Sequence, residues 1–109
     1  MPDDARVSIE DQQNQLLFSA ASIWEVAIKA SLGRDDFNAD ARVLRRGLIE
    51  SGYVKLPISG AHVAAVSDLP AVHRDPFDRM LVSQSRVEGV TLLTNDARVA
   101  EYGAPVRLV

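Results

Sequence analysis

Short apolar runs alternate with amphipathic stretches along the chain, and this alternation restricts the possible folds more than any other feature. Apolar residues that recur with a period near 3.6 predict helices, whereas short apolar runs bounded by Gly or Pro predict buried strands. Alternating strands and helices favour a mostly parallel sheet with helices on its faces, so we predict an α/β fold. The expected strands span residues 16–20, 53–56, 90–94 and 106–109, and the expected helices span 22–32, 40–51, 59–68, 75–88 and 96–102. In the helix at 40–51, we expect Val43, Leu44, Gly47 and Leu48 to point inward.

Size and composition indicate one ordinary globular domain of 109 residues, with 47% hydrophobic and 25% charged residues. The chain has no cysteine, which excludes disulfides and thiolate metal sites. No apolar run approaches the roughly 18 residues of a membrane-spanning helix, and the first residues do not resemble a signal peptide. We therefore expect a cytoplasmic protein with no membrane association. Because the net charge is −3, contact with nucleic acid would require a local basic patch or a metal ion.

The densest run of charges is the string His73–Arg79, HRDPFDR, at the expected start of a helix. Asp75 is a suitable N-cap, because its side-chain oxygen can accept a hydrogen bond from a backbone N–H of the first turn. Pro76 suits the first helical position, where no N–H is needed. The string therefore predicts that Asp78 lies in the first turn of the helix.

Three carboxylates are expected near helix starts: Glu25, Asp78 and Asp96. Glu25 and Asp96 follow predicted strands, and ligands of open α/β sheets bind beyond the carboxyl ends of the strands. Asp78 begins the helix that leads into a strand, so the spacing permits its convergence with the other two without requiring it. Carboxylates suit hard ions such as Mg²⁺ or Mn²⁺, which can activate a water and stabilise the leaving oxygen of a phosphodiester.

Each acid also has a purely structural interpretation. Ser22 and Glu25 fit a capping box, in which Glu25 would bind a backbone N–H. Asp78 would then only complement the helix dipole, and Asp96 would only be an N-cap. Asp75 is better explained as a cap than as a metal ligand.

Three strings resemble PIN-domain ribonucleases, and most of all the VapC-type toxins of bacterial toxin–antitoxin pairs. They are FSAASIWEVAIK at 18–29, HRDPFDRMLV at 73–82 and TLLTND at 91–96. The strings occur in the family's order and at similar separations, and the similarity extends from about Ile9 to Val109. The resemblance implies a PIN-like three-layer α/β fold, with a mostly parallel sheet and helices on both of its faces.

The resemblance also implies a metal-dependent endoribonuclease that cleaves RNA with Mg²⁺ or Mn²⁺. By the match, Glu25, Asp78 and Asp96 take three of the four usual acidic positions. Asp75 is a frequent companion, and Thr94 matches a polar position that helps to arrange the metal and its water. The implied partners are an RNA substrate, a cognate VapB-type antitoxin that masks the site, and a second copy of the chain in a homodimer.

The start of the chain departs from the family pattern. Family members open with a short apolar strand that carries the first metal-binding Asp, and no such strand precedes Asp3 and Asp4. We therefore expect an N-terminally truncated fold that lacks a strand and helix of roughly 20–30 residues. Such a chain would be less stable or would pair with another chain, because buried backbone groups need partners. The alternative function is a catalytically impaired module that binds the antitoxin.

Several basic side chains are candidates for contacts of their own. Arg79 and Arg74 are candidates for RNA binding, with Arg79 the better placed because it neighbours Asp78. The alternative is a solvated face or a salt bridge to one of the acids Asp75, Asp78 or Glu25. Lys29 follows Glu25 by four residues, which predicts an ordinary helix ion pair. A dimer or antitoxin surface is the hypothesis for a further set: Ile23, Trp24, Arg42, Leu44, Arg45, Arg46 and Leu48.

Overall fold

The computed structural model describes residues 14–33 and 39–109. The polar segment at 3–13, which includes Asp3 and Asp4, and residues 34–38, which are most of the loop expected at 35–39, lie outside the described residues. The chain divides into two compact units. The N-terminal unit is Gln15–Pro57, and the described part of the C-terminal unit is Asn14 with Ile58–Val109.

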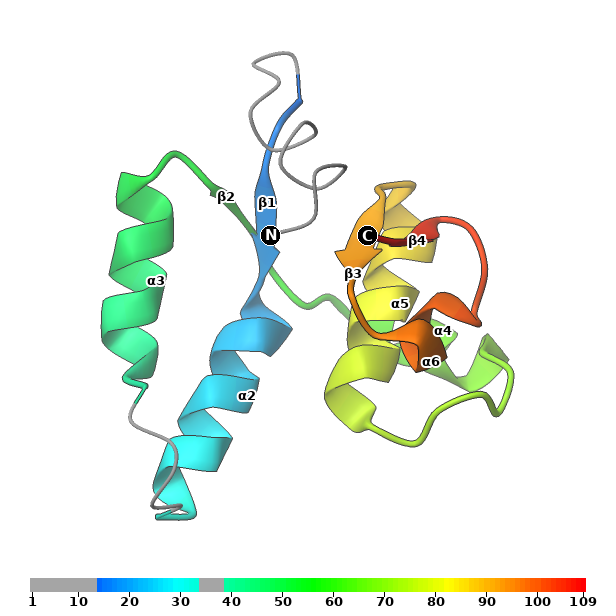
Figure 1. Cartoon of the computed structure of the whole chain (residues 1–109), viewed down its shortest axis with the longest axis horizontal. Coiled ribbons are helices and arrows are strands. Elements are labelled where there is room, and N and C mark those ends of the chain that lie inside the picture. Colours follow the sequence, from blue (N-terminus) through cyan, green and yellow to red (C-terminus); the bar gives the residue numbers. More distant parts are fainter. Residues whose placement is uncertain (1–13, 34–38) are drawn as a thin grey trace. The chain divides into compact units, whose positions relative to one another are not determined.

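The N-terminal unit pairs two short parallel strands and carries two helices (Figure 1). In the pairing of its strands, Leu17 lies opposite Val54 and Ser19 lies opposite Leu56. Helix α2 begins after Ser19, whose Oγ accepts a hydrogen bond from the Ala21 N–H at 2.9 Å. The elements are β1 (Leu17–Ser19), α2 (Ala20–Ser31), α3 (Ala41–Glu50) and β2 (Val54–Leu56).

Two expectations for this unit were wrong. Helix α2 begins at Ala20 and uses Ser19 as its N-cap, so Ser22 and Glu25 do not form a capping box. Helix α3 contains no buried residue, and Val43, which we expected to point inward, is 60% exposed. The helical period correctly indicates a helix, but it does not tell whether another element covers its apolar face.

The C-terminal unit pairs two parallel strands, with Leu92 opposite Val106 and Thr94 opposite Leu108. The helix expected at 59–68 is a short α-helix followed by a 3₁₀ turn. The elements are α4 (Gly60–Ala65), η1 (Val66–Asp68), α5 (Pro76–Glu88), β3 (Leu92–Thr94), α6 (Ala97–Ala100) and β4 (Val106–Leu108).

Helix α5 has the boundaries that its end residues predict. Asp75 caps the first turn, Pro76 occupies the first helical position, and Gly89 ends the helix in the left-handed region with φ +68°. Glycine tolerates this conformation because it has no Cβ. The helix therefore has defined ends, and its first turn holds Asp78 in a defined place.

A hydrophobic cluster lies around α5, with Val82 fully buried. Helix α4 is joined to α5 by hydrogen bonds, since Ser83 Oγ donates to the His62 carbonyl at 2.6 Å and His62 Nε2 contacts Glu88 Oε2 at 2.7 Å. His62 Nδ1 accepts from the Ser59 N–H, so Nε2 donates to Glu88. The buried cluster consists of Leu69, Val82, Val99, Tyr102 and Val106, with Val72 and Leu92 packed against it.

The structure confirms the predicted α/β class with parallel strand pairs. Within the described ranges, no helix is both long enough and apolar enough to cross a membrane.

Candidate metal site

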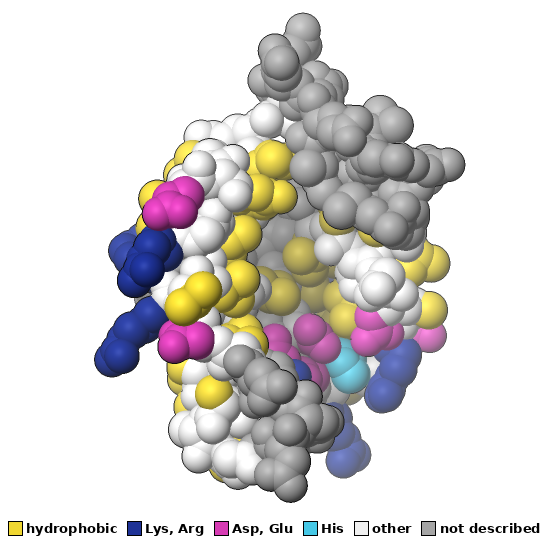
Figure 2. All heavy atoms as spheres, turned by 60° about the vertical axis from the view of Figure 1, so that its left-hand side comes forward, with side chains coloured by type: hydrophobic (Ala, Val, Ile, Leu, Met, Phe, Trp, Pro, Cys, Tyr) yellow, Lys and Arg dark blue, Asp and Glu magenta, His cyan; other side chains and the backbone are white. Residues whose placement is uncertain are grey.

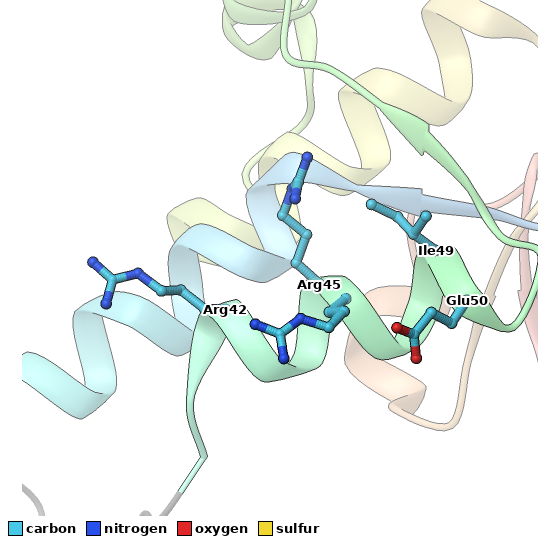
Figure 3. Close-up of a pocket in the computed structure, with 5 residues that line it drawn as sticks. Arg42, Arg45, Ile49 and Glu50 are labelled. Atoms are coloured by element: carbon cyan, nitrogen blue, oxygen red, sulfur yellow. The ribbon is translucent and has the colours of Figure 1, made fainter.

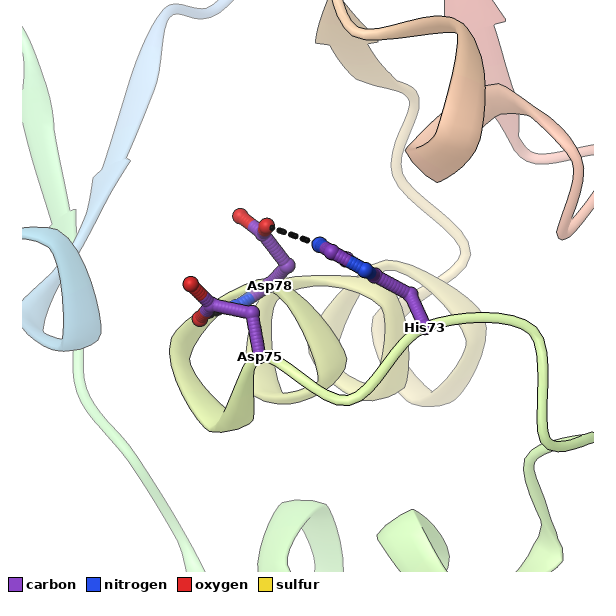
Figure 4. Close-up of side chains that lie close together, drawn as sticks. All are labelled: His73, Asp75 and Asp78. Atoms are coloured by element: carbon purple, nitrogen blue, oxygen red, sulfur yellow. Dashed lines mark hydrogen bonds and ion pairs between the residues drawn. The ribbon is translucent and has the colours of Figure 1, made fainter.

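Three potential metal ligands lie together at the start of α5 (Figure 4). They are His73, Asp75 and Asp78, and each offers a ligand atom within 4.8 Å of those of the other two. Across residues 14–33 and 39–109 this is the one group of three His, Asp or Glu side chains that are close enough to share an ion.

Asp75 has the capping role that the sequence predicts. Its Oδ1 accepts hydrogen bonds from the Phe77 N–H at 2.9 Å and from the Asp78 N–H at 3.1 Å. These two bonds fix the Asp75 carboxylate beside the first turn of α5 and therefore beside the Asp78 side chain (Figure 4).

Asp78 is partly buried and contacts a histidine. Its Oδ2 lies 2.9 Å from His73 Nε2, and the two side chains are 26% and 12% exposed, respectively. The N-terminal end of a helix favours negative charge, which helps α5 to hold two carboxylates close together. Carboxylate oxygens are the ligands that Mg²⁺ and Mn²⁺ prefer, so this donor set fits either ion.

Asp96 and Thr94 form a second polar group, directly after β3. Thr94 Oγ1 accepts a hydrogen bond from the Asp96 N–H at 3.0 Å, and Asp96 Oδ1 accepts one from the Arg98 N–H at 2.9 Å. Asp96 is thus the N-cap of α6, as its structural interpretation predicts. It is not a member of the group formed by His73, Asp75 and Asp78.

Glu25 lies beyond the first turn of α2, and our expectation of a helix-start position for it was wrong because α2 begins at Ala20. Its Oε2 accepts from Lys29 Nζ at 2.9 Å, which confirms the predicted ion pair. Glu25 belongs to the N-terminal unit, whereas Asp78 and Asp96 belong to the C-terminal unit. The convergence of these three carboxylates on one metal stays a prediction.

Arg79 forms an internal network that the sequence did not predict. Its Nη1 donates to the carbonyls of Pro70 and His73 and to Tyr102 Oη, and its Nη2 donates to the Val66 carbonyl, all at 3.1–3.3 Å. The guanidinium thus binds the backbone that precedes α5. These contacts explain the position of Arg79 without RNA, and an RNA-binding role for Arg79 or the exposed Arg74 stays a prediction.

His73 and Tyr102 are the site residues that sequence reasoning underestimated. His73 offered a signal, since it stands five residues before Asp78 within the same charged string. Tyr102 offered none, because it lies 23 residues after Arg79 and its hydroxyl reaches the site only through tertiary packing.

A shallow, open basic groove with a volume of about 450 Å³ lies between exposed side chains of the single helix α3 (Figure 3). The space-filling view shows Lys and Arg side chains that project into solvent near exposed hydrophobic side chains (Figure 2). This groove belongs to the N-terminal unit and contains none of the predicted metal ligands. Its lining residues are Arg42, Arg45, Arg46, Ile49 and Glu50.

Comparison with known proteins gives a match to a family. The sequence model of the PIN domain matches residues 2–105, which is nearly the whole chain. No curated protein matches the chain.

Proposed function

Because the chain belongs to the PIN domain family, whose members are generally metal-dependent nucleases, we propose that it is a ribonuclease that cleaves RNA with Mg²⁺ or Mn²⁺. The observation that carries this proposal is the pair of carboxylates at the start of α5, Asp75 and Asp78, within the region that the family model matches. The two carboxylates would suit a hard divalent ion.

Asp78 is the proposed principal metal ligand, with Asp96 and Glu25 as further ligands. When bound, the ion lowers the pKa of its water and offsets negative charge on the phosphate. Asp75 holds the first turn of α5 through its two hydrogen bonds and adds negative charge beside Asp78. Thr94 holds the backbone of Asp96 at the end of β3.

Asp78→Asn tests this proposal in an RNA cleavage assay with Mn²⁺. We expect the rate to fall by about 100-fold or more, because a catalytic metal supplies several kcal/mol and each 1.36 kcal/mol corresponds to a factor of ten. EDTA should abolish cleavage by the unmodified chain. The matched control is Glu101→Gln, which neutralises an exposed acid at the end of α6 and should leave the rate unchanged.

Two results would contradict the proposal. Asp78→Asn with the rate of the unmodified chain would exclude Asp78 as a ligand. An unmodified chain that binds Mn²⁺ but leaves RNA intact would favour the alternative, an impaired PIN domain that acts as an interaction module.

The finer assignment that we propose is a VapC-type toxin, inhibited by a cognate antitoxin and active as a homodimer. Its support is the family-like order of the three strings together with an exposed apolar stripe on α2. This α2 stripe consists of Trp24 and Ile28 in α2 and Leu32 at its C-cap, which are 49%, 39% and 69% exposed and recur every four residues.

The same stripe is the observation that favours the interaction module as a second candidate, because contiguous exposed apolar side chains mark interaction sites. Sedimentation velocity over a range of concentrations tests self-association directly. If the chain is a monomer at every micromolar concentration, the predicted homodimer is wrong, and the α2 stripe would bind a different partner.

A further inference from the structure

We propose that His73 is a positioning residue for Asp78, and that Arg79 and Tyr102 hold His73 in place. This inference rests on the proposed function, since it assigns a role around the proposed metal ligand. His73, Arg79 and Tyr102 are not among the three carboxylates that the sequence predicts as metal ligands.

The imidazole ring of His73 is bound to Asp78 through one nitrogen. A carboxylate can only accept, so His73 Nε2 donates to Asp78 Oδ2 over 2.9 Å. Nδ1 is buried and has no hydrogen-bond partner among the described residues. The contact with Asp78 is therefore the polar interaction that orients the ring.

The backbone carbonyl of His73 is held by two other side chains. Its carbonyl accepts hydrogen bonds from Arg79 Nη1 and from Tyr102 Oη, each at 3.2 Å. Arg79 Nη1 also donates to Tyr102 Oη at 3.1 Å, which closes a triangle of contacts. Tyr102 belongs to the buried cluster of the C-terminal unit, so the position of His73 is coupled to the hydrophobic core.

These contacts restrict the Asp78 carboxylate. With Oδ2 bound to a ring whose backbone is fixed, rotation of the carboxylate about its terminal bond is limited, and Oδ1 keeps one direction. Groups that orient a metal ligand contribute strongly to affinity, because the ligand otherwise has to be ordered when the ion binds. Without the ring, the Asp78 carboxylate would lose this restraint, and we expect its affinity for the ion to fall.

Mn²⁺ titration followed by electron paramagnetic resonance tests the inference without reference to RNA cleavage. We expect His73→Leu to raise the Kd for Mn²⁺ by about 10- to 100-fold. His73→Gln should recover most of the affinity, because its amide N–H₂ can occupy a position close to Nε2. Tyr102→Phe should raise the Kd less than His73→Leu, because the His73 carbonyl keeps its bond from Arg79.

Cleavage assays and urea unfolding of the same samples separate positioning from a general loss of structure. At saturating Mn²⁺, His73→Leu should recover kcat with an unchanged KM for RNA. Equal losses in His73→Leu and His73→Gln would overturn the inference, since a ring with a merely structural role predicts that Gln does not rescue.

Asp78→Asn is the reference in the same titration. If Asp78→Asn weakens Mn²⁺ binding and His73→Leu does not, the inference is wrong and the proposed function stands. If Asp78→Asn leaves Mn²⁺ binding unchanged, the proposed metal site is wrong, and the role of His73 fails with it.

Discussion

The two units of the chain use their apolar side chains in different ways. The C-terminal unit has a connected buried cluster around Val82 and Tyr102. In the N-terminal unit, the described residues that are buried are Phe18, Ser19 and Ala21, all in β1 or at the start of α2. Its helices instead expose large apolar side chains such as those of the α2 stripe. The comparison indicates that the C-terminal unit is stabilised by its own packing, whereas the N-terminal unit leaves large apolar side chains exposed.

The polar side chains of the two units also differ, because side chains of the C-terminal unit connect separate elements and an ion pair of the N-terminal unit lies within one helix. In the C-terminal unit, Arg79 and His62 each bind two or more groups across different elements. In the N-terminal unit, Glu25 and Lys29 form an ion pair within a single helix, and pairs of this kind contribute about 0.3–0.5 kcal/mol. Glu25 is therefore available for a role other than stability.

The largest effect is expected for a substitution of Glu25, which tests whether the N-terminal unit contributes to catalysis. We expect Glu25→Gln to reduce Mn²⁺-dependent RNA cleavage by about 100-fold, as for the loss of another metal ligand. Lys29→Met breaks the same ion pair but keeps the carboxylate, so it should retain most of the activity. Initial rates at matched Mn²⁺ concentration provide the measurement.

Equal rates for Glu25→Gln and Lys29→Met would show that only the ion pair matters. The metal site would then belong to the C-terminal unit alone, and the predicted convergence of three carboxylates would be wrong.

The next effect concerns stability and uses one substitution in each unit. Val82→Ala removes a fully buried side chain and should lower the free energy of unfolding by about 2 kcal/mol. Val43→Ala, at an exposed position of α3, should change it by no more than about 0.5 kcal/mol. Urea denaturation compares the two variants; similar losses would mean that α3 is covered and that the contrast between the units is false.

The last prediction concerns self-association and uses Ile28→Asp in the α2 stripe. Because Ile28 is exposed, the free energy of unfolding should change by no more than about 0.5 kcal/mol. Self-association should nevertheless weaken, because a charge in an apolar contact loses its hydration. Sedimentation velocity would detect the change; a dimer of unchanged stability would exclude the stripe as the contact surface.

Much of the fold could be predicted because its signals are local. Asp40, Ser59 and Asp75 cap the helices that follow them, and the apolar runs at Leu17–Ser19 and Leu92–Thr94 form strands. The position of Val43 could not be predicted, because a helical pattern does not reveal whether another element lies against it. The ion pair of Glu25 could be predicted, since helix geometry brings residues four apart together.

By itself, the sequence determined the start of α5, where Asp75, Pro76 and Asp78 act on one another over a few residues. Only the tertiary structure decided that Arg79 binds the backbone before α5 and that Tyr102 reaches the His73 carbonyl. Helix capping joins atoms of residues that are only two or three positions apart, so the chain itself keeps these atoms close together. Contacts between positions 23 or 29 residues apart form only once the core has packed, because packing alone brings such groups within hydrogen-bonding distance.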